Sequence, residues 1–236
     1  SYTKDKSNEI SAIPEVLDMI YLRNSVVTID AIGCQHLIAE KINIEKEADY
    51  ALAVKANQGK LMDDIMATFE AGKSSDSHIL EEVTSKHIVK RVCELSTDLS
   101  RIRKKENWKG LSTLAKLTSL RTDKKSGEVT REVRYYISSL KKPKVEDFAS
   151  HIRNHWAVEN KLHWVLDVVF GEDSTAKREA NGIKNFNTVK KAALNLLGRF
   201  DHLNKGRGEQ VSKKSKMLLS LMDTNHREEM LGLDIL

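Results

Sequence analysis

Strand-like and helix-like segments alternate between residues 25 and 71, and this alternation limits the folds open to the chain. Ser25–Ala31 (SVVTIDA) and Tyr50–Val54 (YALAV) are almost wholly apolar, with little polar alternation, a pattern typical of strands buried on both faces. Runs with helical spacing of apolar residues follow at Gln35–Glu47 and Lys60–Ala71. This alternation of strand and helix predicts a parallel β-α-β sheet with helices packed on it.

Polar residues follow both predicted strands. Asp30 stands at the carboxyl end of the first, just before Gly33, and the segment Lys55–Gln58 follows the second. Ligands gather at the carboxyl ends of the strands in open parallel sheets. We therefore expect Asp30 and Lys55–Gln58 to lie at the same edge of the sheet.

The region from Gly72 to Leu140 has a different pattern. Its short runs alternate polar and apolar residues, as antiparallel strands with one solvated face do; they are His78–Glu82, His87–Leu95 and Arg131–Ser138. Lys124–Gly127 has the composition of a turn between two such strands. We interpret the region as a mostly β insertion, attached to the α/β body through Trp108–Leu120.

Four further helices are expected. The first is Ser11–Leu22, with Ser11 as its cap and Pro14 in its first turn. A long helix opens after Pro143 and includes His151–Asp173. A third runs over Gly182–Phe200, with an apolar side formed by Val189, Ala192, Ala193, Leu196 and Leu197. After a charged loop at 201–216, a short terminal helix begins with Met217–Met222.

Glu159 is the most unusual residue of the long helix. It borders an apolar stripe that follows helical spacing, formed by Val158, Leu162, Val165, Leu166, Val169 and Phe170. His155, Glu159, His163 and Asp167 recur every four residues, about one turn apart. A carboxylate beside a buried face is costly to keep for stability alone. The alternative is a solvated helix face with weak ion pairs, and the spacing does not decide between them.

Composition bounds the function only loosely. The net charge is +5, and basic residues cluster at 86–91, 101–109, 121–125, 141–144 and 205–216, which suits a polyanion partner, although lysine-rich loops are common on any soluble protein. The sequence contains no membrane-length apolar run, and its polar start leads us to expect neither a membrane span nor a signal peptide. Cys34 and Cys93 lack zinc-site spacing. A reducing, cytoplasmic setting is expected.

Three blocks of the sequence resemble one protein family. They are TIDAIGCQ (Thr28–Gln35), YALAVKANQ (Tyr50–Gln58) and HWAVENKLHWVLDVVFGED (His155–Asp173), and KSNEI (Lys6–Ile10) resembles the block just upstream. In this order they resemble the H-repeat-associated proteins, a DDE transposase family of bacterial insertion sequences, over essentially the whole chain. The resemblance implies an α/β, ribonuclease H-like core, here without its N-terminal strands, and a mostly β insertion before the catalytic helix.

This fold implies four regions. Residues 1–71 form a partial ribonuclease H-like core, 72–142 the β-rich insertion, 143–202 the catalytic helix and a packing helix, and 203–236 a basic loop with a C-terminal helix.

The same resemblance implies which residues react. The family's second catalytic Asp, in the TIDA block, corresponds to Asp30, and the catalytic Glu of the W-x-x-E-N block corresponds to Glu159. Two Mg²⁺ (or Mn²⁺) ions held by carboxylates would serve phosphoryl transfer. Related insertion-sequence families carry an Arg four residues before that Glu, where this chain has His155. Asp167 and Asp173 are open as additional ligands, although Asp167 is better explained as a helix-end ion pair.

The expected partner is double-stranded DNA, as transposon ends and target, and a homodimer is left open. Lys55, Asn57 and Gln58 could hold the DNA backbone, although polar loops at strand ends are common. Trp156 could stack on a flipped base, although a helical Trp more often belongs to the core.

One departure from the family pattern affects the expected activity. The family's first Asp lies in an Asp-Gly-Lys block, which this sequence does not contain. We expect a C-terminal portion of a transposase for DNA cleavage and strand transfer that is inactive in this truncated form. The alternatives are a non-catalytic DNA-binding remnant and a ribonuclease H-like nuclease or resolvase of other specificity.

Overall fold

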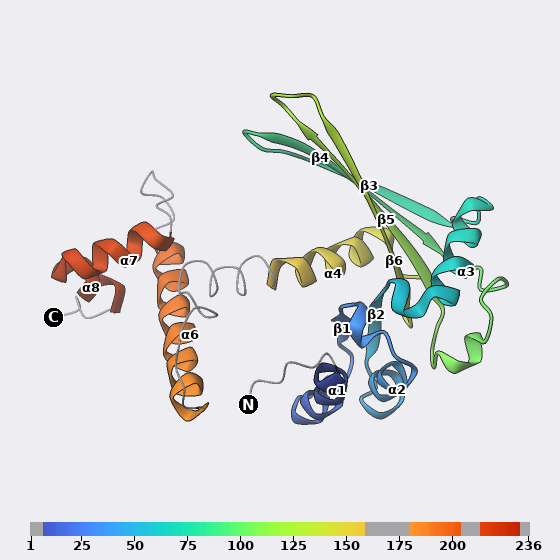
Figure 1. Cartoon of the computed structure of the whole chain (residues 1–236), viewed down its shortest axis with the longest axis horizontal. Coiled ribbons are helices and arrows are strands. Elements are labelled where there is room, and N and C mark those ends of the chain that lie inside the picture. Colours follow the sequence, from blue (N-terminus) through green and yellow to red (C-terminus); the bar gives the residue numbers. More distant parts are fainter. Residues whose placement is uncertain (1–6, 159–179, 204–212, 232–236) are drawn as a thin grey trace. The chain divides into compact units, whose positions relative to one another are not determined.

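The computed structural model describes residues 7–158, 180–203 and 213–231 (Figure 1). The chain divides into two compact units, residues 2–155 and residues 156–236. The first unit holds the sheet and the helices packed on it. The bounds of the four regions predicted from the sequence stay a prediction.

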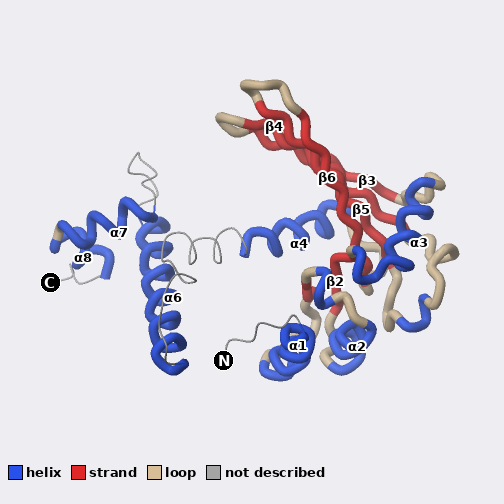
Figure 2. Tube along the Cα trace, in the orientation of Figure 1, coloured by secondary structure: helices blue, strands red, loops and turns tan. Residues whose placement is uncertain are grey.

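A mixed sheet of six strands forms the centre of the first unit (Figure 2). The strands are β1 (Val26–Ile29), β2 (Asp49–Val54), β3 (Asp76–Val83), β4 (His87–Ser96), β5 (Thr113–Asp123) and β6 (Val129–Ser138). Their order is β1-β2-β6-β5-β4-β3. Strands β1 and β2 pair in parallel, and the other neighbours in this sheet are antiparallel. The α/β class and the first parallel pair are therefore confirmed.

The strands of the predicted insertion continue the same sheet, because β6 pairs with β2. Two serines strengthen this junction: the Ser138 hydroxyl donates to the carbonyl of Tyr50 (2.6 Å), and the amide of Tyr50 donates to the hydroxyl of Ser139 (2.9 Å). The prediction that Trp108–Leu120 attaches the insertion is wrong for most of its length. Residues from Thr113 onward form β5, a central strand paired on both sides.

Burial differs between the two parallel strands. In β2, Tyr50, Leu52 and Val54 are buried, as predicted. All four residues of β1 are only half-buried, so the prediction that this strand is covered on both faces is wrong. The reason is its place in the sheet: β1 is an edge strand and pairs with β2 alone among the described residues.

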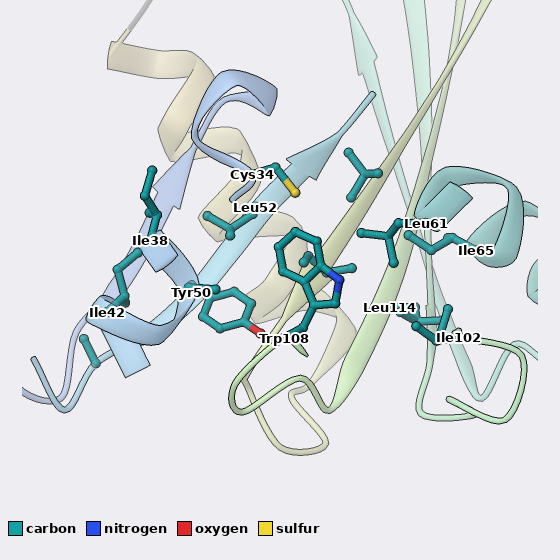
Figure 3. Close-up of a cluster of buried hydrophobic side chains, with 14 of the residues drawn as sticks. Cys34, Ile38, Ile42, Tyr50, Leu52, Leu61, Ile65, Ile102, Trp108 and Leu114 are labelled. Atoms are coloured by element: carbon teal, nitrogen blue, oxygen red, sulfur yellow. The ribbon is translucent and has the colours of Figure 1, made fainter. Parts of the chain in front are cut away.

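The main core lies on one face of the sheet (Figure 3). Helix α2 (His36–Glu40) continues as one π-helical segment (Lys41–Glu45), and α3 is Gly59–Glu70. These helices and the loop before β5 pack over β2, β5 and β6; the buried side chains include Ile38, Ile42, Tyr50, Leu52, Ile65, Trp108, Leu114 and Ile137. The predicted helix at Gln35–Glu47 is therefore α-helical only in its first part.

Two other helices lie wholly or mostly in the first unit. Helix α1 is Ser7–Met19, and Pro14 lies inside it, so the predicted start at Ser11 with Pro14 in the first turn is wrong. Helix α4 is Val145–Val158. It packs on the face opposite the main core, where Phe148 meets Tyr136 edge to face. The predicted continuation of this helix to Asp173 lies outside the described residues.

The second unit contains α6 (Ala180–Leu203), α7 (Lys213–Met222) and α8 (Thr224–Leu231). Leu194 and Leu197 are buried in it, whereas Val189 is 62% exposed. The apolar side predicted around Val189 is thus wrong at that residue, because the buried face turns toward Leu194. No helix in the described part of the chain combines the length and the apolar character that crossing a membrane requires.

A buried carboxylate attaches the loop before β5 to α3. Asp64 is only 7% exposed, and its two oxygens accept the Arg103 Nε (2.8 Å), the Arg103 Nη2 (2.7 Å) and the Arg103 backbone amide (2.9 Å). The carboxylate also raises the pKa of the Arg103 guanidinium. A paired Arg satisfies the planar carboxylate with parallel donors.

Replacing this arginine should leave the carboxylate short of donors. We expect Arg103→Ala to lower the free energy of unfolding, because the nearly buried Asp64 carboxylate then loses its guanidinium donors. Chemical denaturation followed by circular dichroism measures this. Arg101→Ala, an exposed arginine of the same loop, is the control and should change stability by less than about 0.5 kcal/mol; equal losses in both variants would contradict the role of Asp64.

Candidate active site at the end of β1

Alternation along β1 divides its side chains between two environments. Val27 and Ile29 pack against the main core. Thr28 and Asp30 are offset by one residue and therefore face the opposite side, where α4 lies. Asp30 follows the last residue of the strand, and its side chain is 64% exposed. The sheet thus presents a carboxylate at its edge, on the α4 side.

A histidine from α4 contacts both of these residues. His155 lies 3.1 Å through its Nδ1 from the Thr28 hydroxyl and 3.4 Å through its Nε2 from the Asp30 Oδ1. It is seven residues after Phe148 and three after Ile152, both buried, so the helix face that packs on the sheet also carries the imidazole. Residues more than 120 positions apart are joined in this way. Sequence reasoning missed Thr28, although its place two residues before Asp30 on a strand was a signal.

The loop after β2 supports the segment that follows Asp30. The Asn57 Nδ2 donates to the carbonyl of Ala31 (2.6 Å), and the Gln58 Nε2 donates to the carbonyl of Cys34 (2.9 Å). The sequence-based expectation that Asp30 and Lys55–Gln58 share one edge of the sheet is confirmed by these bonds and by the parallel register. Both amides bind backbone, and Lys55 is exposed. Their roles toward DNA stay predictions.

Close packing restricts the turn after Asp30 as well. A Cβ on Gly33 would lie 2.3 Å from the Cγ2 of Ile29, so a larger residue would have to displace the Ile29 side chain. Burial raises the pKa of the neighbouring Cys34 thiol to about 12. A thiol with this pKa stays protonated near neutral pH and is therefore a poor nucleophile.

The remaining predicted site residues fall into two groups. Trp156 is half-buried in α4. Glu159, His163, Asp167 and Asp173 lie outside the described residues, so their places relative to Asp30 stay predictions. Within the described residues, no group of three or more His, Cys, Asp or Glu side chains is arranged so that it could hold a metal ion. Several basic residues of the predicted DNA-binding clusters are engaged in ion pairs, including Arg91 with Glu82 and Arg103 with Asp64.

The sequence matches the family model of the transposase DDE domain over residues 1–196. The chain therefore belongs to the DDE transposase family, and the resemblance based on the three blocks is confirmed.

Among its curated relatives is "Putative transposase YncI" of Escherichia coli O157:H7, 41% identical over 98% of this chain and 58% of the relative. "H repeat-associated putative transposase YhhI" of Escherichia coli K12 is 39% identical over 98% of this chain and 61% of its own length. "H repeat-associated putative transposase YbfD" of the same strain is 52% identical over 25% of this chain and 23% of the relative. The chain thus spans about three-fifths of the length of the first two.

The hydrogen bond from Asn57 to Ala31 should contribute to folding as well as to the site. We expect Asn57→Ala to lower the free energy of unfolding by about 1 kcal/mol, the net worth of a neutral hydrogen bond. Thermal and urea denaturation measure it. Lys55→Ala, in the same loop, is the control and should stay within about 0.5 kcal/mol of the parent chain. If Lys55→Ala lowered the free energy of unfolding as much as Asn57→Ala does, the stabilising role of the hydrogen bond from Asn57 to Ala31 would be contradicted.

Burial of the Cys34 thiol should appear in its chemistry. With a pKa of about 12, its thiolate fraction at pH 8 is on the order of 10⁻⁴. In a Cys93→Ser variant, which leaves Cys34 as the one thiol of the chain, we expect slow reaction with an aromatic disulfide reagent at pH 8 and fast reaction in urea. Fast reaction of the folded variant would show that the loop after Asp30 is open.

Proposed function

We propose that this chain is a catalytic portion of a transposase that cleaves DNA and joins the ends of an insertion sequence, on a ribonuclease H-like core. The observation that carries the proposal is the placement of Asp30. It is an exposed carboxylate at the end of β1, in contact with His155 of α4, and His155 stands four residues before Glu159 in the sequence. Asp30 and Glu159 are proposed as the catalytic pair.

The residues of the site fit a divalent cation such as Mg²⁺ or Mn²⁺. The Asp30 carboxylate supplies hard oxygen ligands at a solvent-accessible sheet edge, and Mg²⁺ binds through one or two carboxylates while it keeps several waters. The bound ions would supply activation of the attacking oxygen and stabilisation of the leaving one. Asp30 and Glu159 would hold them.

The other residues of the site would either orient Asp30 or contact DNA. Thr28 fixes one ring nitrogen of His155, so the other is directed at Asp30 and limits the orientations of the carboxylate. Asn57 and Gln58 hold the turn after Asp30 in place. Lys55, exposed just after β2, is the basic residue that we assign to contact with a DNA phosphate. Trp156 is the candidate for stacking on a base.

Metal binding by the whole 236-residue chain tests the proposal without requiring activity. Titration with Mn²⁺, followed by the electron paramagnetic resonance signal of the free ion, should reveal binding. Asp30→Asn and Glu159→Gln should each weaken it at least about tenfold, since loss of a ligand costs no less than loss of a group supporting one. Asp63→Asn, an exposed acid on α3, is the matched control and should leave the affinity unchanged.

DNA binding separates the proposal from the alternative of a non-catalytic remnant. Fluorescence anisotropy with an insertion-sequence end should show binding that Mn²⁺ strengthens in the parent chain and no longer strengthens in Asp30→Asn. Binding that falls steeply with salt, yet ignores both Mn²⁺ and the Asp30 substitution, would favour the remnant. Equal Mn²⁺ affinity in the parent chain, Asp30→Asn and Glu159→Gln would refute the proposed catalytic pair.

A further inference from the structure

The outer half of the sheet has one face that the proposed function leaves without a role. The β3–β4 and β5–β6 hairpins extend past α2 and α3 (Figure 1). Residues directly opposite each other in the register share a face, and on the main-core side the hairpins carry mostly apolar residues. We call this set the hairpin face: Ile79, Glu81 and Val83 of β3, Ile88, Lys90 and Val92 of β4, Thr118, Leu120 and Thr122 of β5, and Val129, Arg131 and Val133 of β6.

Solvent reaches much of this apolar surface. Ile79 is 56% exposed, Val83 is 63% exposed and Val129 is 58% exposed. Four more apolar members of the hairpin face are only half-buried: Ile88, Val92, Leu120 and Val133. These aliphatic side chains lie on one solvent-exposed face of the sheet, and exposed apolar groups gathered in this way are typical of interaction surfaces.

Charge on the hairpin face is confined to one row. Across the four strands this row reads Glu81, Lys90, Leu120, Arg131. The rows on either side contain no charge: one is Val83, Ile88, Thr122, Val129, and the other is Ile79, Val92, Thr118, Val133. Glu81 and Arg131 lie on the two outer strands, about 14 Å apart at ordinary strand spacing, too far to pair with each other in one chain.

We propose that the hairpin face binds a second copy of this chain. A two-fold axis parallel to the strands, between β4 and β5, lays β3 of one copy over β6 of the other. The charged rows of the two copies then face each other in opposite order: Glu81 faces Arg131 of the partner subunit, a pair that occurs twice, and Lys90 faces Leu120 of the partner subunit. The uncharged rows meet in the same way: Val83 faces Val129 of the partner subunit, and Ile79 faces Val133 of the partner subunit. One surface is thereby complementary to itself, as a two-fold dimer requires.

The dimensions of the face indicate how strong this dimer is. Four strands by five residues give about 19 Å by 17 Å of sheet, packed on its copy as in an aligned β-sandwich. The flat area is about 320 Å² per copy, smaller than the roughly 800 Å² per partner of a standard interface, so the contact belongs with weak and transient interfaces. We therefore expect a dimer that dissociates in the micromolar range and in which the two ion pairs decide register and orientation. Its formation does not depend on the metal site.

Charge reversal tests the pairing. Sedimentation velocity of the whole chain, from low micromolar to a few hundred micromolar concentration, should show a monomer–dimer equilibrium. Glu81→Arg and Arg131→Glu should each raise the dissociation constant at least about tenfold, because both contacts of the dimer become like-charged. An equimolar mixture of the two variants should restore dimerisation as a heterodimer. In it the arginine introduced at position 81 of one copy faces the glutamate introduced at position 131 of the other, and the native Glu81 and Arg131 form the second pair. The double variant carrying both changes should dimerise as the parent chain does.

Substitutions outside and inside the hairpin face serve as controls. Glu106→Arg and Arg101→Glu, two exposed residues of the loop before β5, should leave dimerisation unchanged. Val83→Asp, an exposed position whose replacement should spare the fold, should abolish dimerisation while circular dichroism and the melting temperature stay the same. A monomer at every concentration would overturn the proposal. So would a dimer that both charge reversals leave intact, or one that the mixture fails to restore.

Discussion

The contact of His155 with Thr28 and Asp30 is the constraint on which the candidate site depends. It joins the end of the first strand to a helix more than 120 residues later. The contact exists because Val145, Phe148 and Ile152 bury one face of α4 against the sheet, and the imidazole lies on that same face. The Asp30 side chain is exposed, so the orientation of its carboxylate depends on His155, which packing of α4 holds in place. A carboxylate held in this way keeps its oxygens available to a ligand.

The continuity of the sheet makes this arrangement possible. Strands β3 to β6 extend the β1–β2 pair through β6, with Ser138 and Ser139 bonding to Tyr50. The chain leaves β6 next to β2 and enters α4 within a few residues, so α4 crosses the sheet on the side of Thr28 and Asp30. The β-rich region therefore does two things: it completes the sheet on which α4 packs, and it carries an apolar face beyond the core.

Local patterns were enough to predict much of this fold. The β-branched run before Asp30 and the run YALAV predict the parallel pair, because buried strands leave a clear compositional signal. The turn at Lys124–Gly127 was predicted from its residues, and it links β5 to β6. The three sequence blocks identified the family, which the family match confirms.

What the sequence did not predict depends on long-range pairing. Half-burial of β1 follows from its place at the edge of the sheet, which periodicity cannot specify. Thr113–Asp123 pairs on both sides as β5, although its sequence alternates too weakly to reveal a central strand. The bonds of Asn57 and Gln58 to the turn after Asp30 also escaped prediction, because an amide in a polar loop fits a ligand and a backbone carbonyl equally well.

The position of a bound cation tests the proposed catalytic pair most directly. Crystals of the chain soaked in Mn²⁺ would show it by anomalous diffraction, which does not depend on activity or on DNA. We expect a peak at coordination distance, about 2 Å, from an Asp30 carboxylate oxygen, with Glu159 as a second ligand of the same cluster. Manganese bound elsewhere on the chain, with Asp30 still directed only at His155, would contradict the role proposed for both carboxylates.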